Sequence, residues 1–140
     1  MKTNYNKIKD MFKKKINKTN YKKQESSYQK KADAIWSEVI KIRDGYRCVL
    51  CGKTENLNSH HIIHKSRGKA VRYEILNGVC LCAGCHNFKI HKGDFLANKK
   101  LVEIVGSERI EAIQKLLIGV YKPDYQKIIS DLQECKNNIK

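Results

Sequence analysis

The chain has 140 residues, which is enough for one domain with an appended segment. Lys and Arg together number 29 against 14 Asp and Glu, giving a formal net charge of +15. This balance indicates a polyanionic partner, with nucleic acid favoured over a membrane surface. No segment has the run of about 18 apolar residues that a membrane span needs, and the N-terminus lacks the apolar core of a secretory signal. We therefore expect a cytoplasmic protein, in which paired cysteines favour metal binding over disulfides.

Residues 1–31 form a basic segment, which we interpret as an N-terminal arm. It contains eleven lysines and only two acidic residues. Tyr5, Ile8, Phe12 and Ile16 fall at helical spacing and predict a short amphipathic helix, formed alone or on DNA. Two interpretations remain open: an arm that binds phosphates, or a solvated tail that aids solubility.

The next elements are a helix and two strands. An apolar stripe predicts a helix over residues 28–43, which Asp44 and Gly45 end in a turn. The stripe consists of Tyr28, Ala32, Ile35, Val39 and Ile42. Short apolar runs bounded by turn residues predict strands over residues 57–63 and 78–81.

The rest of the chain is predicted to be helical. A helix is expected to begin within residues 83–91. Gly106 is expected to stop a helix, Ser107 to act as the next N-cap, and Pro123 to start the last helix. The apolar faces of the last two helices are Ile110, Ile113, Leu117 and Val120, then Tyr125, Ile128, Leu132, Cys135 and Ile139.

Four cysteines have the spacing of a zinc site. Cys48 and Cys51 form one C-x2-C pair, and Cys82 and Cys85 form another. Two residues between cysteines allow both thiolates of a turn to bind one ion, and two such turns complete a tetrahedral set for Zn²⁺. Such a site has no open position, so this zinc is expected to be structural and to couple folding to metal binding.

Three histidines suggest a second metal site. Adjacent side chains of a strand point to opposite faces, so His60 and His61 are expected to have different roles, one binding a cation and the other facing a water molecule. His86 follows Cys85, and about 100° of helical rotation would aim these two side chains at different ions.

Four other residues receive weaker interpretations. Cys80 is expected in the core, and Cys135 is expected to be a packed free thiol. His64 is interpreted as a structural or phosphate-contacting residue. For His91 an extra ligand, a phosphate contact and a residue at a helix C-terminus all remain open.

The segments RDGYRCVLCGK, SHHIIHKS and LNGVCLCAGCHNFKIH, in this order, resemble the HNH endonucleases over residues 35–91. The sequence that follows resembles, more weakly, small phage recombination nucleases of this family, which suggests a virus-encoded protein in a bacterial host. The resemblance implies an α+β fold with a ββα-metal core, stapled by a zinc site of four cysteines and flanked by helices. We divide the chain into a basic arm at 1–31, a nuclease core at 32–93 and a helical extension at 94–140.

The resemblance also implies roles for individual residues. His61 corresponds to the general base that deprotonates the attacking water, while His60 and His86 correspond to ligands of a single Mg²⁺, Mn²⁺ or similar ion. Asn77 stands at the middle position, which binds the metal in some members and braces the loop in others. The basic residues expected to bind the DNA backbone near this site are Lys65, Arg67, Lys69, Arg72 and Lys89.

These expectations define a leading hypothesis, a metal-dependent DNA endonuclease. A zinc-stabilised DNA-binding or recombination accessory protein without nuclease activity is the alternative. A zinc-dependent protein-interaction module is disfavoured by the positive charge. The choice of DNA target stays open, as does the choice between monomer and homodimer.

Overall fold

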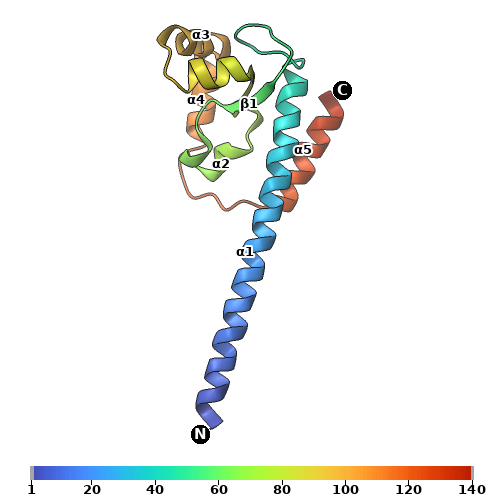
Figure 1. Ribbon diagram of the computed structural model, residues 1–140, viewed down its shortest axis with the longest axis vertical. Helices are drawn as coiled ribbons and strands as arrows, with labels where there is room; N and C mark the ends of the chain where they lie inside the picture. Colours follow the sequence, from blue (N-terminus) through green and yellow to red (C-terminus); the bar gives the residue numbers. More distant parts are fainter. Residues whose placement is uncertain (1, 140) are drawn as a thin grey trace.

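The computed structural model describes residues 2–139, with side chains described from residue 18 onward. A small cluster of elements surrounds the C-terminal half of one long helix (Figure 1). The elements are, in chain order, α1 (Lys2–Arg43), β1 (Leu57–His61), η1 (Lys65–Arg67), α2 (Lys69–Arg72), η2 (Ile75–Asn77), β2 (Gly78–Cys82), η3 (Cys85–Ile90), α3 (Phe95–Val105), α4 (Ser107–Lys115) and α5 (Tyr125–Ile139). Among the described residues, no helix combines the length and the apolar character that a membrane span requires.

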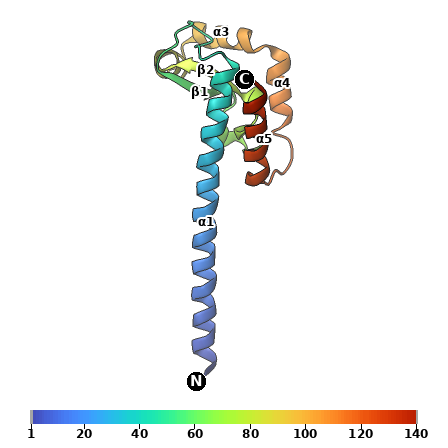
Figure 2. The same ribbon diagram turned by 90° about the vertical axis from the view of Figure 1, so that its right-hand side faces the viewer.

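Helix α1 is continuous and longer than the sequence predicted. It crosses position 31 without a break and ends at Arg43, where Gly45 adopts a φ of 64° in the predicted turn. Its N-terminal part extends alone beyond the other elements (Figures 1 and 2). The side chains of the predicted stripe from Tyr5 to Ile16 lie outside those described. The division into arm, core and extension stays a prediction.

The packed face of α1 differs in part from the predicted stripe. Ala32 and Val39 are buried as expected, but so are Trp36 and Ile40, which the stripe omitted. Both the predicted stripe and the observed buried face have apolar residues at steps of three or four. The apolar pattern alone therefore does not fix the rotation of the helix about its axis. The buried cluster on this side contains Ala32, Trp36, Ile40, Tyr73 and Leu132.

Strands β1 and β2 pair as an antiparallel hairpin, in which His61 lies opposite Gly78 and His60 opposite Val79. β1 ends at His61, two residues earlier than predicted. The backbone of the next two residues turns to Asn77 instead: Ile62 donates to its carbonyl and Ile63 to its side-chain oxygen. β2 is buried at every position, which explains its uninterrupted apolar sequence.

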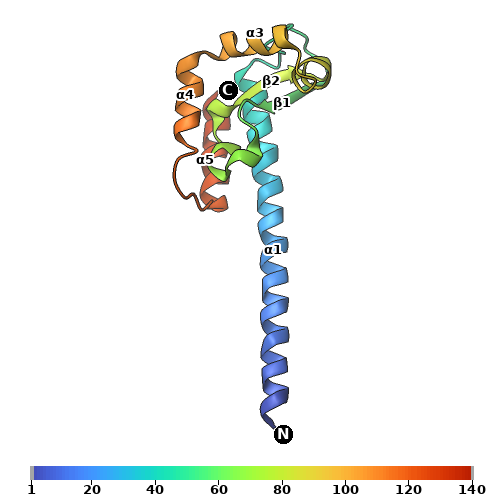
Figure 3. The ribbon, with the colours of Figure 1, turned by 90° about the vertical axis from the view of Figure 1, so that its left-hand side faces the viewer.

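The two faces of the hairpin meet different partners. Figure 3 shows the hairpin close to α3 and to the upper end of α1. The cluster on the α3 side contains Cys48, Leu50, Val79, Leu81, Cys82, Cys85, Leu101 and Val105. On the α1 side, the hydroxyl of Ser37 donates to that of Ser59 in β1 at 3.0 Å. The hairpin is therefore the layer that separates the two clusters.

Two predictions about α4 were wrong. Ser107 is the first residue of α4, and Gly106, with a φ of 82°, occupies the N-cap position. The helix ends at Lys115, so Leu117 and Val120 do not continue its face. Leu117 donates to a carbonyl three residues earlier rather than four, which tightens the chain into a turn, and Val120 is fully exposed.

Helix α5 begins after Pro123, not at it. Asp124 caps the helix, because its side-chain oxygen accepts from the backbone N–H of Lys127 at 3.1 Å. Leu132 is buried on the predicted face.

The close packing over Gly78 leads to a first prediction. A Cβ atom at this position would lie 2.5 Å from Ile40 and 2.7 Å from Trp36. Gly78→Ala should therefore lower the free energy of unfolding by about 1–3 kcal/mol, as overpacked core substitutions do. Urea unfolding of the zinc-loaded protein measures this, with Gly84→Ala as the control, because a Cβ there meets no atom nearer than 3.9 Å. Equal stability of the two variants would contradict the packing described.

Candidate metal centres and candidate catalytic histidine

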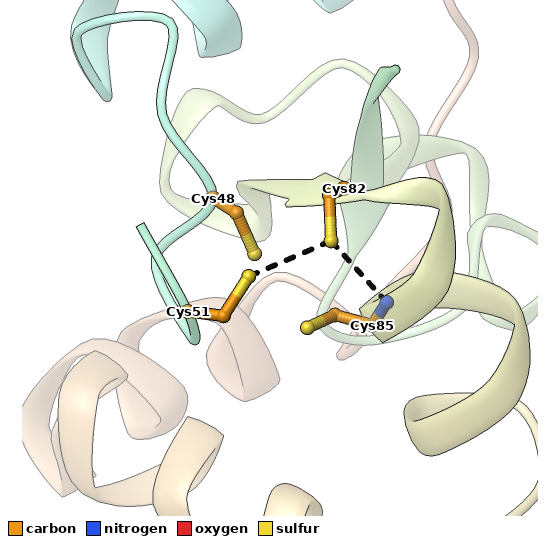
Figure 4. A group of neighbouring side chains, drawn as sticks. All are labelled: Cys48, Cys51, Cys82 and Cys85. Carbon is orange, nitrogen blue, oxygen red and sulfur yellow. Dashed lines mark hydrogen bonds between the residues drawn. The ribbon is translucent and has the colours of Figure 1, made fainter. Parts of the chain in front are cut away.

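The four predicted cysteines converge on one point (Figure 4). Their sulfur atoms lie within 4.8 Å of one another, and those of Cys51 and Cys82 are 3.6 Å apart. Tetrahedral Zn²⁺ with Zn–S bonds of about 2.3 Å holds its sulfurs about 3.8 Å apart, so the four thiols fit a zinc ion. Cys48 and Cys51 precede β1, whereas Cys82 is the last residue of β2 and Cys85 is the first residue of η3. The cluster thus joins the two ends of the hairpin.

Backbone donors at this cluster favour thiolate. The N–H of Cys85 donates to the sulfur of Cys82 at 3.4 Å. Burial raises the pKa of Cys48, but backbone hydrogen bonds from Cys82, Cys51 and Leu50 outweigh burial and bring it to about 7. Burial and the neighbouring cysteines raise the pKa of Cys85. A cluster in which Cys48 ionises readily beside Cys85, whose pKa is raised, is suited to releasing protons as it takes up a metal.

A second cluster contains three histidines, one more than the predicted pair. Potential ligand nitrogens of His60, His86 and His91 lie within 4.8 Å of one another. The Nε2 atoms of His86 and His91 are 3.1 Å apart. Two ligands at about 2.1 Å from an ion and at right angles to each other would be separated by about 3.0 Å, so this pair fits one ion. The structure therefore groups His91 with the predicted ligands.

The local helix type explains how His91 joins the cluster. Residues Cys85–Ile90 form a π-helix, in which the N–H of His91 donates to the carbonyl of His86 at 3.1 Å, five residues back. A π turn brings positions i and i+5 onto one face, which the α-helical rotation expected from the sequence does not. The Nδ1 atom of His86 contacts the side-chain oxygen of Asn87 at 2.9 Å, an arrangement that directs Nε2 toward the cluster.

His60 is well suited to remain a neutral ligand. Burial, followed by the proximity of His86 and His91, lowers its pKa to about 4. Its ring meets those of both neighbours edge to face, with centroids 5.2 and 5.5 Å away. Metal ligation needs the unprotonated imidazole, which His60 therefore provides over a wide pH range.

His61 lies on the other face of β1, as strand geometry predicted. Its Nε2 atom is 2.8 Å from the backbone carbonyl oxygen of Arg72. A carbonyl only accepts, so Nε2 carries the proton and Nδ1 carries the lone pair. Burial lowers the pKa of His61, the bond to the carbonyl opposes this, and nearby Lys65 and Arg72 lower it further. A neutral imidazole with one oriented lone pair is equipped to accept a proton.

Asn77 braces the backbone rather than facing the histidine cluster. It is fully buried, and its amide nitrogen donates to the carbonyls of Ile63 and Val71 at 2.8 and 2.9 Å. Its oxygen accepts from the N–H of Ile63 at 2.7 Å. Of the two roles that the resemblance implies for Asn77, the contacts are those of a residue that holds the loop after His61.

Four of the five predicted DNA-binding residues are exposed: Lys65, Arg67, Lys69 and Lys89. Arg72 differs, because its guanidinium donates two hydrogen bonds to Asp33 at 2.9 and 2.6 Å. Its charge is already paired inside the protein, and its carbonyl is the group that holds His61.

The remaining residues take structural positions. His64 caps the turn after the strand, since its Nδ1 accepts from the N–H of Ser66 at 3.2 Å. Cys80 is fully buried, and Cys135 is half-buried on α5.

Comparison with known proteins finds a family match for one part of the chain. Residues 48–92 match the family model described as HNH endonuclease. No significant match was found among curated proteins or among solved structures. The matched segment contains both cysteine pairs, the hairpin and the three histidines of the second cluster. Residues 48–92 are thus similar to the HNH endonuclease family, in an α+β fold consistent with the ββα-metal core.

Proposed function

We propose that the protein is a metal-dependent DNA endonuclease, in which His61 is the general base and His60, His86 and His91 hold the catalytic ion. The observation that carries this proposal is that two adjacent histidines lie on opposite faces of β1 with different neighbours. One histidine enters a three-imidazole cluster, while its neighbour presents an oriented lone pair on the other face. The family of the segment 48–92 supports the same chemistry.

The reaction is hydrolysis of a phosphodiester bond. Nδ1 of His61 takes a proton from water as the water oxygen bonds to phosphorus, and the bond from phosphorus to the 3′ oxygen breaks. The departing oxygen takes a proton from solvent. A divalent ion bound by the three histidines would supply polarisation of the phosphate and offset charge on that oxygen. Asn77 holds the loop that follows His61.

The donor set bears on the choice of ion. Three imidazoles form this cluster, and no carboxylate belongs to it among the described residues. Mg²⁺ prefers oxygen ligands, whereas imidazole suits transition-metal ions. Of the two ions considered first, Mn²⁺ is the better candidate. The four-cysteine cluster would hold a separate, structural Zn²⁺.

The partner proposed is DNA, bound mainly through its phosphates. The chain carries a formal net charge of +15, and Lys65, Arg67, Lys69 and Lys89 are exposed on the elements around the histidines. The extended basic part of α1 would add contacts that carry no sequence information. Arg72 is left out of this surface because Asp33 pairs with it.

The first test is plasmid cleavage by zinc-loaded protein with Mn²⁺, Mg²⁺ or EDTA. His61→Ala should lower the cleavage rate by about 10²- to 10⁴-fold, the contribution of a positioned general base, while DNA binding persists. His64→Ala is the matched control, because this exposed histidine caps a turn nearby and should keep the wild-type rate.

Failure of the folded, zinc-loaded wild type to cut plasmid, single-stranded or branched DNA would remove the endonuclease proposal. DNA binding without cleavage would then favour the accessory protein considered above. Equal losses in His61→Ala and His64→Ala would reject His61 as the base.

A second test concerns the basic part of α1. The seven lysines within residues 1–20 can be replaced by glutamine, which removes their charge and keeps the length of the helix. They are Lys2, Lys7, Lys9, Lys13, Lys14, Lys15 and Lys18. If these lysines bind phosphates, the slope of log K against log salt should become shallower by about 0.9 for each phosphate that is no longer neutralised. Fluorescence anisotropy with a labelled duplex measures the slope, and an unchanged slope would show that this segment does not bind DNA.

A further inference from the structure

Trp36 of α1 lies against the proposed base, although it stands outside the segment that matches the family model. The indole ring stacks on the imidazole of His61, with ring centroids 4.0 Å apart and planes within 8° of parallel. Trp36 is only 3% exposed. One face of the His61 ring is therefore covered by a flat, closely packed surface.

The indole is itself fixed on two sides. Its N–H donates to the carbonyl of Glu74 at 3.1 Å. The ring also packs on Gly78, the residue opposite His61 in the hairpin, where a Cβ would come within 2.7 Å of the indole. Tilting of the indole is thus opposed by a hydrogen bond at its edge and by backbone beneath it.

Helix α1 also fixes the edge of the imidazole. Asp33 lies three residues before Trp36 and pairs with Arg72 through two hydrogen bonds. The carbonyl of Arg72 is the acceptor for Nε2 of His61. One short stretch of α1 therefore restrains the ring twice, over its face through Trp36 and at its Nε2 atom through Asp33 and Arg72.

We propose that Trp36 is a positioning residue for the general base, holding the plane of the His61 ring so that Nδ1 points at the attacking water. This inference rests on the proposed function, and it extends the catalytic unit to a helix that precedes the HNH segment. A base whose ring can tilt or flip presents its lone pair in the wrong direction for part of the time. Loss of Trp36 should therefore lower kcat, while DNA binding and the ligands of the ion stay unchanged.

The experiment compares Trp36→Leu and Trp36→Phe with wild type and with Ile40→Val. Ile40 is buried, packs on the same glycine and does not stack on His61, so its variant controls for a general loosening of this core. In plasmid nicking with Mn²⁺, kcat should fall on the order of tenfold in Trp36→Leu and less in Trp36→Phe, which keeps an aromatic face. KM should stay within about twofold throughout, and Ile40→Val should keep the wild-type kcat.

A second measurement does not depend on cleavage. Nitrogen-15 NMR of the zinc-loaded protein reports the tautomer and exchange of the His61 ring. Wild type and Ile40→Val should show one protonated Nε2, whereas Trp36→Leu should show a mixture of tautomers. If wild type cuts no DNA, the proposed function fails, while this spectrum still decides whether Trp36 orients the ring.

The inference is overturned if the Trp36 variants match Ile40→Val in both kcat and ring tautomer. If Trp36→Leu does not fold, the test rests on Trp36→Phe and Ile40→Val alone. The same kcat and the same ring tautomer in these two variants would then overturn the inference.

Discussion

The pairing of β1 with β2 in a single register is the constraint on which the proposed chemistry depends. Side chains alternate between the faces of a strand, so this register sends His60 toward η3 and His61 toward α1. A slip by one residue would exchange the two faces. The imidazole now beside His86 and His91 would then lie against Trp36, and neither ring would meet its partners. The separation of His60 from His61 is thus a property of the sheet.

Several independent contacts hold this register. The four cysteines join the start and the end of the hairpin at one point. Asp44, just after α1, accepts from the N–H of Cys80 at 2.7 Å, and both Arg43 and Arg109 donate to the carbonyl of Gly78 at 2.6 Å. These contacts tie β2 to α1 and α4 as well as to β1. A bound zinc would therefore strengthen an arrangement that the flanking helices already specify.

Some of the site was predictable because its signals are local. Cysteine pairs two residues apart indicate metal-binding turns whatever surrounds them, and adjacent histidines on a strand must diverge. The parts of the site that the sequence left open or omitted depend on tertiary structure or on an unusual local structure. His91 reaches its partners through a π turn, which α-helical spacing does not anticipate. The contact between Trp36 and His61 depends on how α1 rotates against the hairpin, and the apolar pattern of α1 allowed two rotations. Arg72 was predicted by its charge alone, but its neighbour in space is Asp33.

The proposed mechanism assigns adjacent histidines to different tasks, and counting the ions that each variant binds tests this assignment most directly. Mn²⁺ is titrated into zinc-loaded wild type, His60→Ala and His61→Ala, and the free ion is measured by electron paramagnetic resonance. Wild type and His61→Ala should each bind one Mn²⁺ with similar affinity, because His61 faces α1, whereas His60→Ala should bind it at least about tenfold more weakly. Equal effects of the two substitutions on Mn²⁺ binding would contradict the division of roles across β1.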